Sequence, residues 1–219
     1  MKGKDIMSNE RLLKPVEDMK DKQMTYAFLK SKRKEAVKQE FYFESIHISY
    51  AIIEDRTRSF FYHLGYLETR KEFCKCARGT NEFFKEVFRQ YVSKNKLSKK
   101  NKTISGLENK LILISAVTEF VKENAECRLV PKKYYELLRN RMEKYGFEKV
   151  LDIVEETRKW KALRNEITHA LANKTIFDFK DRLKKISDDG IIISDKIDEI
   201  VKVIKSQNLL RKHLVFLVE

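Results

Sequence analysis

Glycine and proline are scarce in this chain, and their scarcity limits the fold classes open to it. The 219 residues include six glycines and two prolines. Sandwiches, barrels and doubly wound sheets need many tight turns, which these two residue types normally supply. So few glycines also leave no Gly-rich phosphate loop of the Walker or dinucleotide-binding kind. The sequence therefore predicts an all-α protein.

Long apolar runs and paired cysteines are missing as well. The longest apolar runs, near residues 111–117, fall far short of the roughly 20 residues that cross a bilayer. Residues 1–21 mix charged residues with scattered apolar ones, so we expect no signal peptide there. Cys74, Cys76 and Cys127 form an odd set with no disulfide or zinc-finger spacing. We therefore expect a cytoplasmic protein with reduced thiols, no membrane partner, no metal site and no cofactor.

Positive charge is abundant and unevenly distributed. The chain has 47 Lys and Arg against 33 Asp and Glu, a formal net charge of +14. Residues 1–105 contribute 24 basic and 14 acidic residues, so most of the excess lies in this half. Such a balance favours a polyanionic partner such as RNA. The most basic short segment, 94–102, is predicted to be a solvated loop that either contacts RNA phosphates or only aids solubility. Its lysines are Lys94, Lys96, Lys99, Lys100 and Lys102.

The spacing of apolar residues predicts a helical bundle. Gly65 and Gly146 are placed where helices should end, and Asp189–Gly190 is predicted to be a turn. Short connections favour antiparallel neighbours, so we expect an up-and-down bundle with peripheral helices. Residues 1–30 are predicted to be an N-terminal appendage, and 31–219 a single helical domain. The predicted helices are 31–64, 80–93, 107–125, 132–145, 147–173, 175–187 and 195–213.

The segment 160–170 carries the residues best suited to chemistry. It reads Trp-Lys-Ala-Leu-Arg-Asn-Glu-Ile-Thr-His-Ala, with Asn165 directly after Arg164 and four residues between Arg164 and His169. This pattern resembles the signature of the HEPN superfamily, all-helical proteins that are commonly metal-independent ribonucleases. The resemblance implies an HEPN-like bundle, endoribonuclease activity and a homodimer with one shared site. It further implies a toxin or antiviral abortive-infection effector, with an antitoxin or regulatory protein as a further partner.

These residue types suit RNA cleavage for physical reasons. RNA supplies its own nucleophile, the 2′-hydroxyl, so the enzyme needs a proton shuttle and a group that stabilises charge on the phosphate. His169 has the pKa range of a shuttle, and the Arg164 guanidinium is permanently charged and matches phosphate oxygens. Asn165 is one helical turn before His169 and can orient it. Arg164 and His169 are about 140° apart around a helix, so two helices paired across a twofold axis are expected to complete the site.

Other residues have both a functional and a structural interpretation. Trp160 is predicted to be structural, in a core or interface. Thr168 is given a minor role in touching phosphate. Arg58 and His63 repeat the four-residue spacing of the motif, and the sequence does not decide whether they join the site. The charged cluster of the predicted helix 31–64 either faces the cleft and orients the motif or forms a solvated, ion-paired face. Its members are Glu54, Asp55 and Arg56.

Two functions of another class remain open at this stage. The chain could be a non-catalytic adaptor that binds RNA or an acidic protein through its basic surface, in which case binding would weaken with salt and be indifferent to His169. It could also be a regulatory partner whose bundle masks another nuclease. Labelled RNA mixed with the protein and EDTA separates the nuclease from both.

Overall fold

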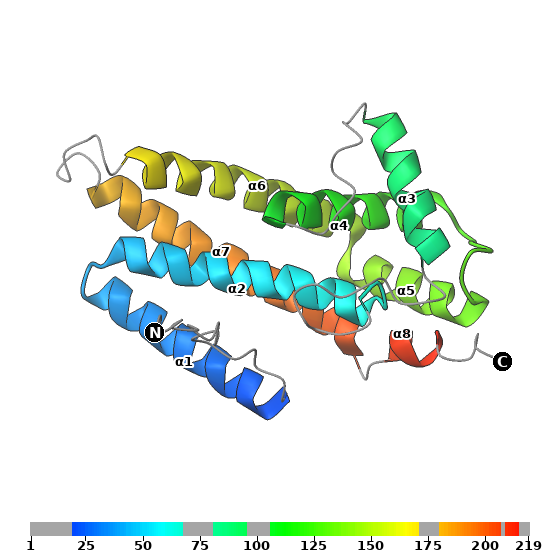
Figure 1. Cartoon of the computed structure of the whole chain (residues 1–219), viewed down its shortest axis with the longest axis horizontal. Coiled ribbons are helices and arrows are strands. Elements are labelled where there is room, and N and C mark those ends of the chain that lie inside the picture. Colours follow the sequence, from blue (N-terminus) through cyan, green and yellow to red (C-terminus); the bar gives the residue numbers. More distant parts are fainter. Residues whose placement is uncertain (1–18, 68–80, 96–105, 171–179, 207–208, 215–219) are drawn as a thin grey trace, which may run out of the picture.

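The computed structural model describes residues 19–67, 81–95, 106–170, 180–206 and 209–214, and every element in these ranges is a helix. The predicted all-α class and helical bundle are confirmed. None of these described helices is long and apolar enough to cross a membrane. The helices are α1 (Met19–Lys38), α2 (Tyr42–His63), α3 (Asn81–Lys94), α4 (Gly106–Glu123), α5 (Lys132–Tyr145), α6 (Phe147–Ala170), α7 (Lys180–Lys205) and α8 (Leu209–Lys212) (Figure 1).

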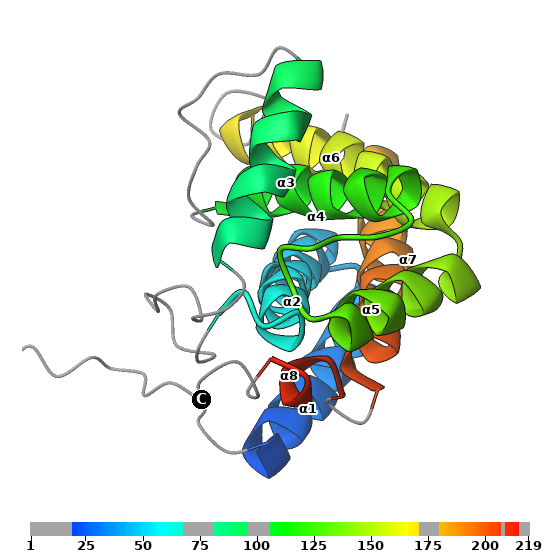
Figure 2. The same ribbon diagram turned by 90° about the vertical axis from the view of Figure 1, so that its right-hand side faces the viewer.

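The helix pair α2 and α7 forms the centre of the bundle and has the most extensive contact in it. Small polar residues let the two helices approach: Ser187 Oγ donates a hydrogen bond of 2.8 Å to Ser45 Oγ, and both side chains are buried. Helix α1 packs on α2, and α6 packs on both α4 and α7. At the other end of the bundle, α3 crosses α4 at a steep angle (Figures 1 and 2). Helices α2 and α6 are thus held beside each other by a shared neighbour, α7.

An aromatic core fixes the end of the bundle where α3, α4 and α5 meet. Phe83 of α3 packs edge-to-face against Phe120 of α4 and against Tyr134 of α5. The Tyr134 hydroxyl is fully buried and donates a hydrogen bond of 2.7 Å to the Leu64 carbonyl, which satisfies the polar atom that burial would otherwise leave without a partner. This core ties the C-terminal end of α2 to the second half of the chain.

The predicted helix 31–64 is wrong in its first third. The structure divides it into α1 and α2 at residues 39–41, where Glu40 takes a left-handed backbone conformation with φ of 61°. Phe41 N–H donates to the Ala36 carbonyl at 2.8 Å, which closes the end of α1 without a glycine. After this break, α2 runs back along α1. The boundary predicted between residues 30 and 31 falls inside the continuous helix α1.

The helix ends at Gly65 and Gly146 are confirmed, whereas the turn at Asp189–Gly190 is wrong. Gly65 and Gly146 have φ values of 80° and 99°, a region that glycine occupies without strain. Helix α7 instead continues through Gly190, and the segment from 180 to 205 is one helix. Gly190 is used for close packing, because the Trp160 indole of α6 lies directly against its Cα.

Candidate functional site

Arg164 projects from α6 toward α2, and its partners among the described residues are an amide, an imidazole and a phenol ring. Its Nη1 donates a hydrogen bond of 3.1 Å to Asn165 Oδ1, and its Nη2 lies 3.2 Å from His47 Nδ1. Its guanidinium carbon is 4.4 Å from the centroid of the Tyr50 ring, a cation–π distance. Its Nε is buried and has no hydrogen-bond partner among the described residues. We call Arg164, Asn165, His47 and Tyr50 the Arg164 site.

The α2 side of this site is a single stripe of the helix. Phe43, His47, Tyr50 and Glu54 follow at spacings of four, three and four, which places them within about 60° around the axis. The Phe43 ring meets the His47 ring edge-on with centroids 4.4 Å apart. Tyr50 reaches Glu54 through its hydroxyl, and burial followed by the Glu54 charge raises the pKa of Tyr50. The stripe therefore presents the His47 imidazole and the Tyr50 ring to Arg164, and Phe43 packs behind the imidazole.

Glu54, the acidic residue of that stripe, forms an ion pair with Lys110 of α4. Lys110 is 5% exposed, and its Nζ donates to Glu54 Oε1 at 2.9 Å and approaches the Glu54 carbonyl at 3.4 Å. Farther along α6, Lys161 and Arg158 share the Glu108 carboxylate at 2.8 Å and 2.9 Å. The carboxylates on this part of α2 and α4 are thus engaged by other cations, and no described carboxylate compensates the charge of Arg164.

The other arginines that reach into the bundle have partners of a different kind. Arg33 approaches Asp195, and Arg56 pairs with the buried Asp198 at 2.8 Å. Arg141 and Arg211 donate to backbone carbonyls at the ends of α7 and α2, where the helix dipole is negative. Within the described part of the chain, Arg164 forms no ion pair. A guanidinium held in place by neutral groups retains its charge for an anion that arrives from outside.

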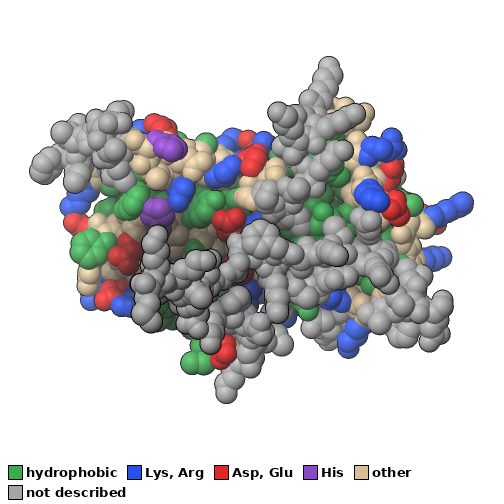
Figure 3. Space-filling view, in the orientation of Figure 1, with side chains coloured by type: hydrophobic (Ala, Val, Ile, Leu, Met, Phe, Trp, Pro, Cys, Tyr) green, Lys and Arg blue, Asp and Glu red, His purple; other side chains and the backbone are tan. Residues whose placement is uncertain are grey.

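The remaining motif residues lie around α6 as helical geometry requires. His169 is exposed and makes no hydrogen bond or ion pair to another described residue. Thr168 Oγ1 donates to the Arg164 carbonyl at 2.9 Å, so its hydroxyl is occupied by the helix rather than free for a phosphate. Figure 3 shows histidine side chains on one face of the molecule, toward the ends of α6 and α2, with basic side chains close to them. The structure joins Asn165 to Arg164 through a hydrogen bond, whereas His169 makes no hydrogen bond to either residue.

The charged cluster of α2 is divided among three neighbours, and most of it does not support the motif. Asp55 accepts hydrogen bonds from Lys22 and Tyr26 of α1. Arg56 stacks on the Tyr26 ring at 4.0 Å in addition to its ion pair with α7. Of the two interpretations of this cluster, the ion-paired face holds for Asp55 and Arg56, because they pair with α1 and α7 and not with the motif. Only Glu54 lies on the stripe that includes Tyr50.

Trp160 is structural, as predicted. It is 2% exposed, and its Nε1 donates a hydrogen bond of 2.8 Å to the Ile186 carbonyl of α7. The ring therefore fixes α6 to α7 one turn before Arg164. This contact sets the position from which Arg164 reaches α2.

The lysines predicted to contact RNA are mostly beyond the described residues. Lys96, Lys99, Lys100 and Lys102 lie there. Lys94 is the last residue of α3 and pairs with Glu119 at 3.0 Å and with Glu123 at 2.6 Å. The predicted loop thus begins one residue too early, and Lys94 is engaged by two carboxylates of α4.

The second Arg-His pair with the same spacing is not part of the Arg164 site. His63 is 3% exposed and ends α2. It follows His47 by 16 residues, which is about 24 Å along a helix. His63 is therefore far from His47 and the Arg164 site.

His47 and Tyr50 are the residues that sequence reasoning missed. The sequence signal that could have found them is the stripe, because His47 and Tyr50 fall on the same helix face as Phe43. Nothing local shows that this face meets Arg164, because the contact joins positions 117 residues apart.

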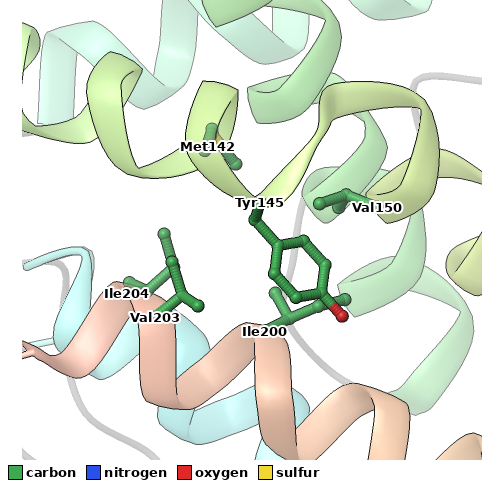
Figure 4. Close-up of a pocket in the computed structure, with 6 residues that line it drawn as sticks. All are labelled: Met142, Tyr145, Val150, Ile200, Val203 and Ile204. Carbon is green, nitrogen blue, oxygen red and sulfur yellow. The ribbon is translucent and has the colours of Figure 1, made fainter.

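The described ranges contain a small apolar hollow away from this site and no metal centre. A small apolar hollow between α5, α6 and α7 has a volume of about 10 Å³, enough for one water molecule at most. No group of three or more His, Cys, Asp or Glu that could hold a metal ion occurs in the part of the chain that the structure describes. The hollow is lined by Met142, Tyr145, Val150, Ile200, Val203 and Ile204 (Figure 4).

Comparisons with protein-family models, with curated proteins and with solved structures found no match to this chain.

Proposed function

We propose that this chain is a metal-independent endoribonuclease of the HEPN type that acts on RNA as a cytoplasmic homodimer. The observation that carries the proposal is the guanidinium of Arg164, which is held by His47, Asn165 and the Tyr50 ring and has no carboxylate partner in the described part of the chain. A cation fixed in this way is suited to a phosphodiester, whose charge increases as the bond is cut. The resemblance of the 160–170 segment to the HEPN signature supplies the reaction class.

In the proposed reaction the 2′-hydroxyl oxygen attacks the adjacent phosphorus and the bond to the 5′-oxygen breaks. His169 transfers the proton, as a base toward the hydroxyl or as an acid toward the leaving oxygen. Arg164 stabilises the charge on the phosphate oxygens, and Asn165 orients the guanidinium through its carbonyl oxygen. The products are a 2′,3′-cyclic phosphate and a 5′-hydroxyl. DNA lacks the nucleophile and should resist.

The proposed dimer follows from the separation of the two catalytic groups on one helix. Arg164 points into the bundle toward α2, whereas His169 is exposed. Positions 164 and 169 are also about 140° apart around a helix axis, so the phosphate-binding cation and the proton shuttle of one protomer diverge. A second copy placed across a twofold axis brings its own His169 toward the first protomer's Arg164. A role as a toxin or abortive-infection effector, checked by an antitoxin or regulatory protein, rests on the resemblance alone.

The test is cleavage of end-labelled RNA in EDTA by the purified chain and by two variants. His169→Ala and Arg164→Ala should lose cleavage by a factor on the order of 10² or more, with unchanged helicity and unchanged mass in sedimentation. His213→Ala is the matched control and should cleave normally, because His213 lies near α8, at the other end of the bundle from Arg164. Full cleavage by His169→Ala would remove the assignment. Salt-sensitive binding without any cleavage by the wild type would favour an adaptor.

A further inference from the structure

The contact between Arg164 and His47 determines which protons the imidazole carries. A guanidinium has only donors, so the short contact at 3.2 Å requires His47 Nδ1 to accept. The imidazole is then neutral, with its proton on Nε2. Protonation of Nδ1 would remove the acceptor and place a second positive charge beside the first.

The surroundings of His47 hold it in this neutral state. Burial, followed by the charge of Arg164, lowers the pKa of His47 below its ordinary value of 6.5. The other charged groups that face this part of α2 are paired elsewhere: Lys110 with Glu54, and Arg33 with Ser49 and Ser194 and near Asp195. Helix α7 presents the neutral Ser187. Arg164 is therefore the charged group that His47 repels when its imidazole is protonated.

The ring of His47 is also fixed in direction. Phe43 packs edge-on against it one turn earlier, and Tyr50 lies beneath the guanidinium one turn later. Together the imidazole and the phenol ring form a platform from α2 on which the planar guanidinium rests. Lysine in place of Arg164 has no planar group to use this platform.

We propose that His47 is the positioning residue of Arg164: in its neutral form it holds the guanidinium of the motif arginine in place for the phosphodiester, and in its protonated form it releases it. This inference rests on the proposed nuclease function for its consequence on cleavage, but the contact itself can be tested without any cleavage. Activity should fall at acid pH as His47 protonates and releases Arg164.

The first experiment follows the two side chains by NMR in the full-length chain. His47 is assigned by its absence in His47→Asn, and its pKa should rise in Arg164→Gln by on the order of one unit, because a neighbouring cation has been removed. The Nη protons of Arg164 should be resolved and protected in the wild type at neutral pH. They should lose protection when His47 protonates. An unchanged His47 pKa in Arg164→Gln overturns the proposal whether or not the chain cuts RNA.

The second experiment compares two replacements of His47. The side-chain carbonyl oxygen that His47→Asn introduces occupies nearly the place of Nδ1 and accepts a hydrogen bond but does not titrate, whereas His47→Ala has no acceptor. His47→Asn should keep Arg164 protected and should cleave RNA within about threefold of the wild type, and its activity should fall less steeply toward acid pH because position 47 no longer titrates. His47→Ala should lose protection and at least tenfold in cleavage, a change of about 1.4 kcal/mol in the barrier. Equal behaviour of the two variants would overturn the positioning role. If the wild type does not cut RNA but protection follows this pattern, only the proposed function fails.

Discussion

Gly190 of α7 lies directly against the indole of Trp160 of α6: a Cβ at position 190 would approach Trp160 Cζ2 to 2.6 Å and Cε2 to 2.9 Å. The indole also donates its N–H to the Ile186 carbonyl, one turn earlier on α7. Two helices are therefore joined at a point where one supplies a large ring and the other supplies no side chain. The same ring stands one turn before Arg164, so this contact places the arginine.

Gly190→Ala should destabilise the protein although alanine is the better helix former. The clash with a buried ring costs about 1–3 kcal/mol, and the gain in helix propensity recovers up to about 1 kcal/mol. We expect a net loss of about 1–2 kcal/mol in the free energy of unfolding, measured by urea titration. In a Trp160→Leu background, which removes the ring, adding Gly190→Ala should cost much less. If Gly190→Ala lowered the free energy of unfolding equally with and without Trp160→Leu, the clash with the indole ring would not be the cause of the destabilisation.

Asp55→Asn should weaken the attachment of α1 in a pH-dependent way. Although desolvation of the half-buried side chain opposes ionisation, Lys22 and Tyr26 together lower the pKa of the Asp55 carboxyl below 3.8. A lowered pKa means that this stabilisation is present above about pH 4 and is lost as the pH falls through the folded-state value. Because solvent screens the partly exposed pair, we expect Asp55→Asn to cost only about 1 kcal/mol at pH 7 and progressively less toward pH 2.

Urea titrations of both proteins across this pH range make the comparison. The matched control is Asp152→Asn, because Asp152 is an exposed carboxylate of α6 for which no ion pair is found among the described residues. It should give a small, nearly constant difference. If the difference in free energy of unfolding between the wild type and Asp55→Asn stayed constant with pH, ionised Asp55 would not be what stabilises the attachment of α1.

Arg164→Lys should separate charge from geometry in the Arg164 site. Lysine keeps the positive charge but loses the fork of donors and the planar contact with Tyr50. We expect cleavage of RNA to fall by on the order of 10², while thermal unfolding shifts little. Activity close to that of the wild type would show that a point charge at this position is sufficient.

Asn165→Asp should lower RNA binding more than Asn165→Ala does. An aspartate beside Arg164 would form the ion pair that the native site lacks and would neutralise the cation that is meant for the phosphate. The alanine variant only removes the carbonyl oxygen that orients it. Binding of a fluorescent DNA strand, which is not cut, measures both variants at equal salt. If the aspartate variant bound as tightly as the alanine variant, the charge of Arg164 would not be directed at the nucleic acid.

Local sequence patterns were sufficient where the deciding interactions are local. The positive φ values at Gly65 and Gly146 and the helix that carries 160–170 follow from residues within a few turns of each position. The break at Glu40 was missed because no glycine or proline marks it, and Phe41 N–H closes α1 through a backbone hydrogen bond that many residue types allow. Gly190 was misread as a turn because a glycine needed for packing and a glycine needed for a turn look the same in one sequence.

The sequence by itself determined the helical class, the excess of positive charge and the placement of Arg164, Asn165 and His169 around one helix, because these depend on composition and on the period of the α-helix. The tertiary structure alone decided that Arg164 rests on His47 and Tyr50, and that Asp55 and Arg56 turn toward α1 and α7. Those partners come from distant parts of the chain, and only the packing of α2 and α6 against their common neighbour α7 brings them within bonding distance.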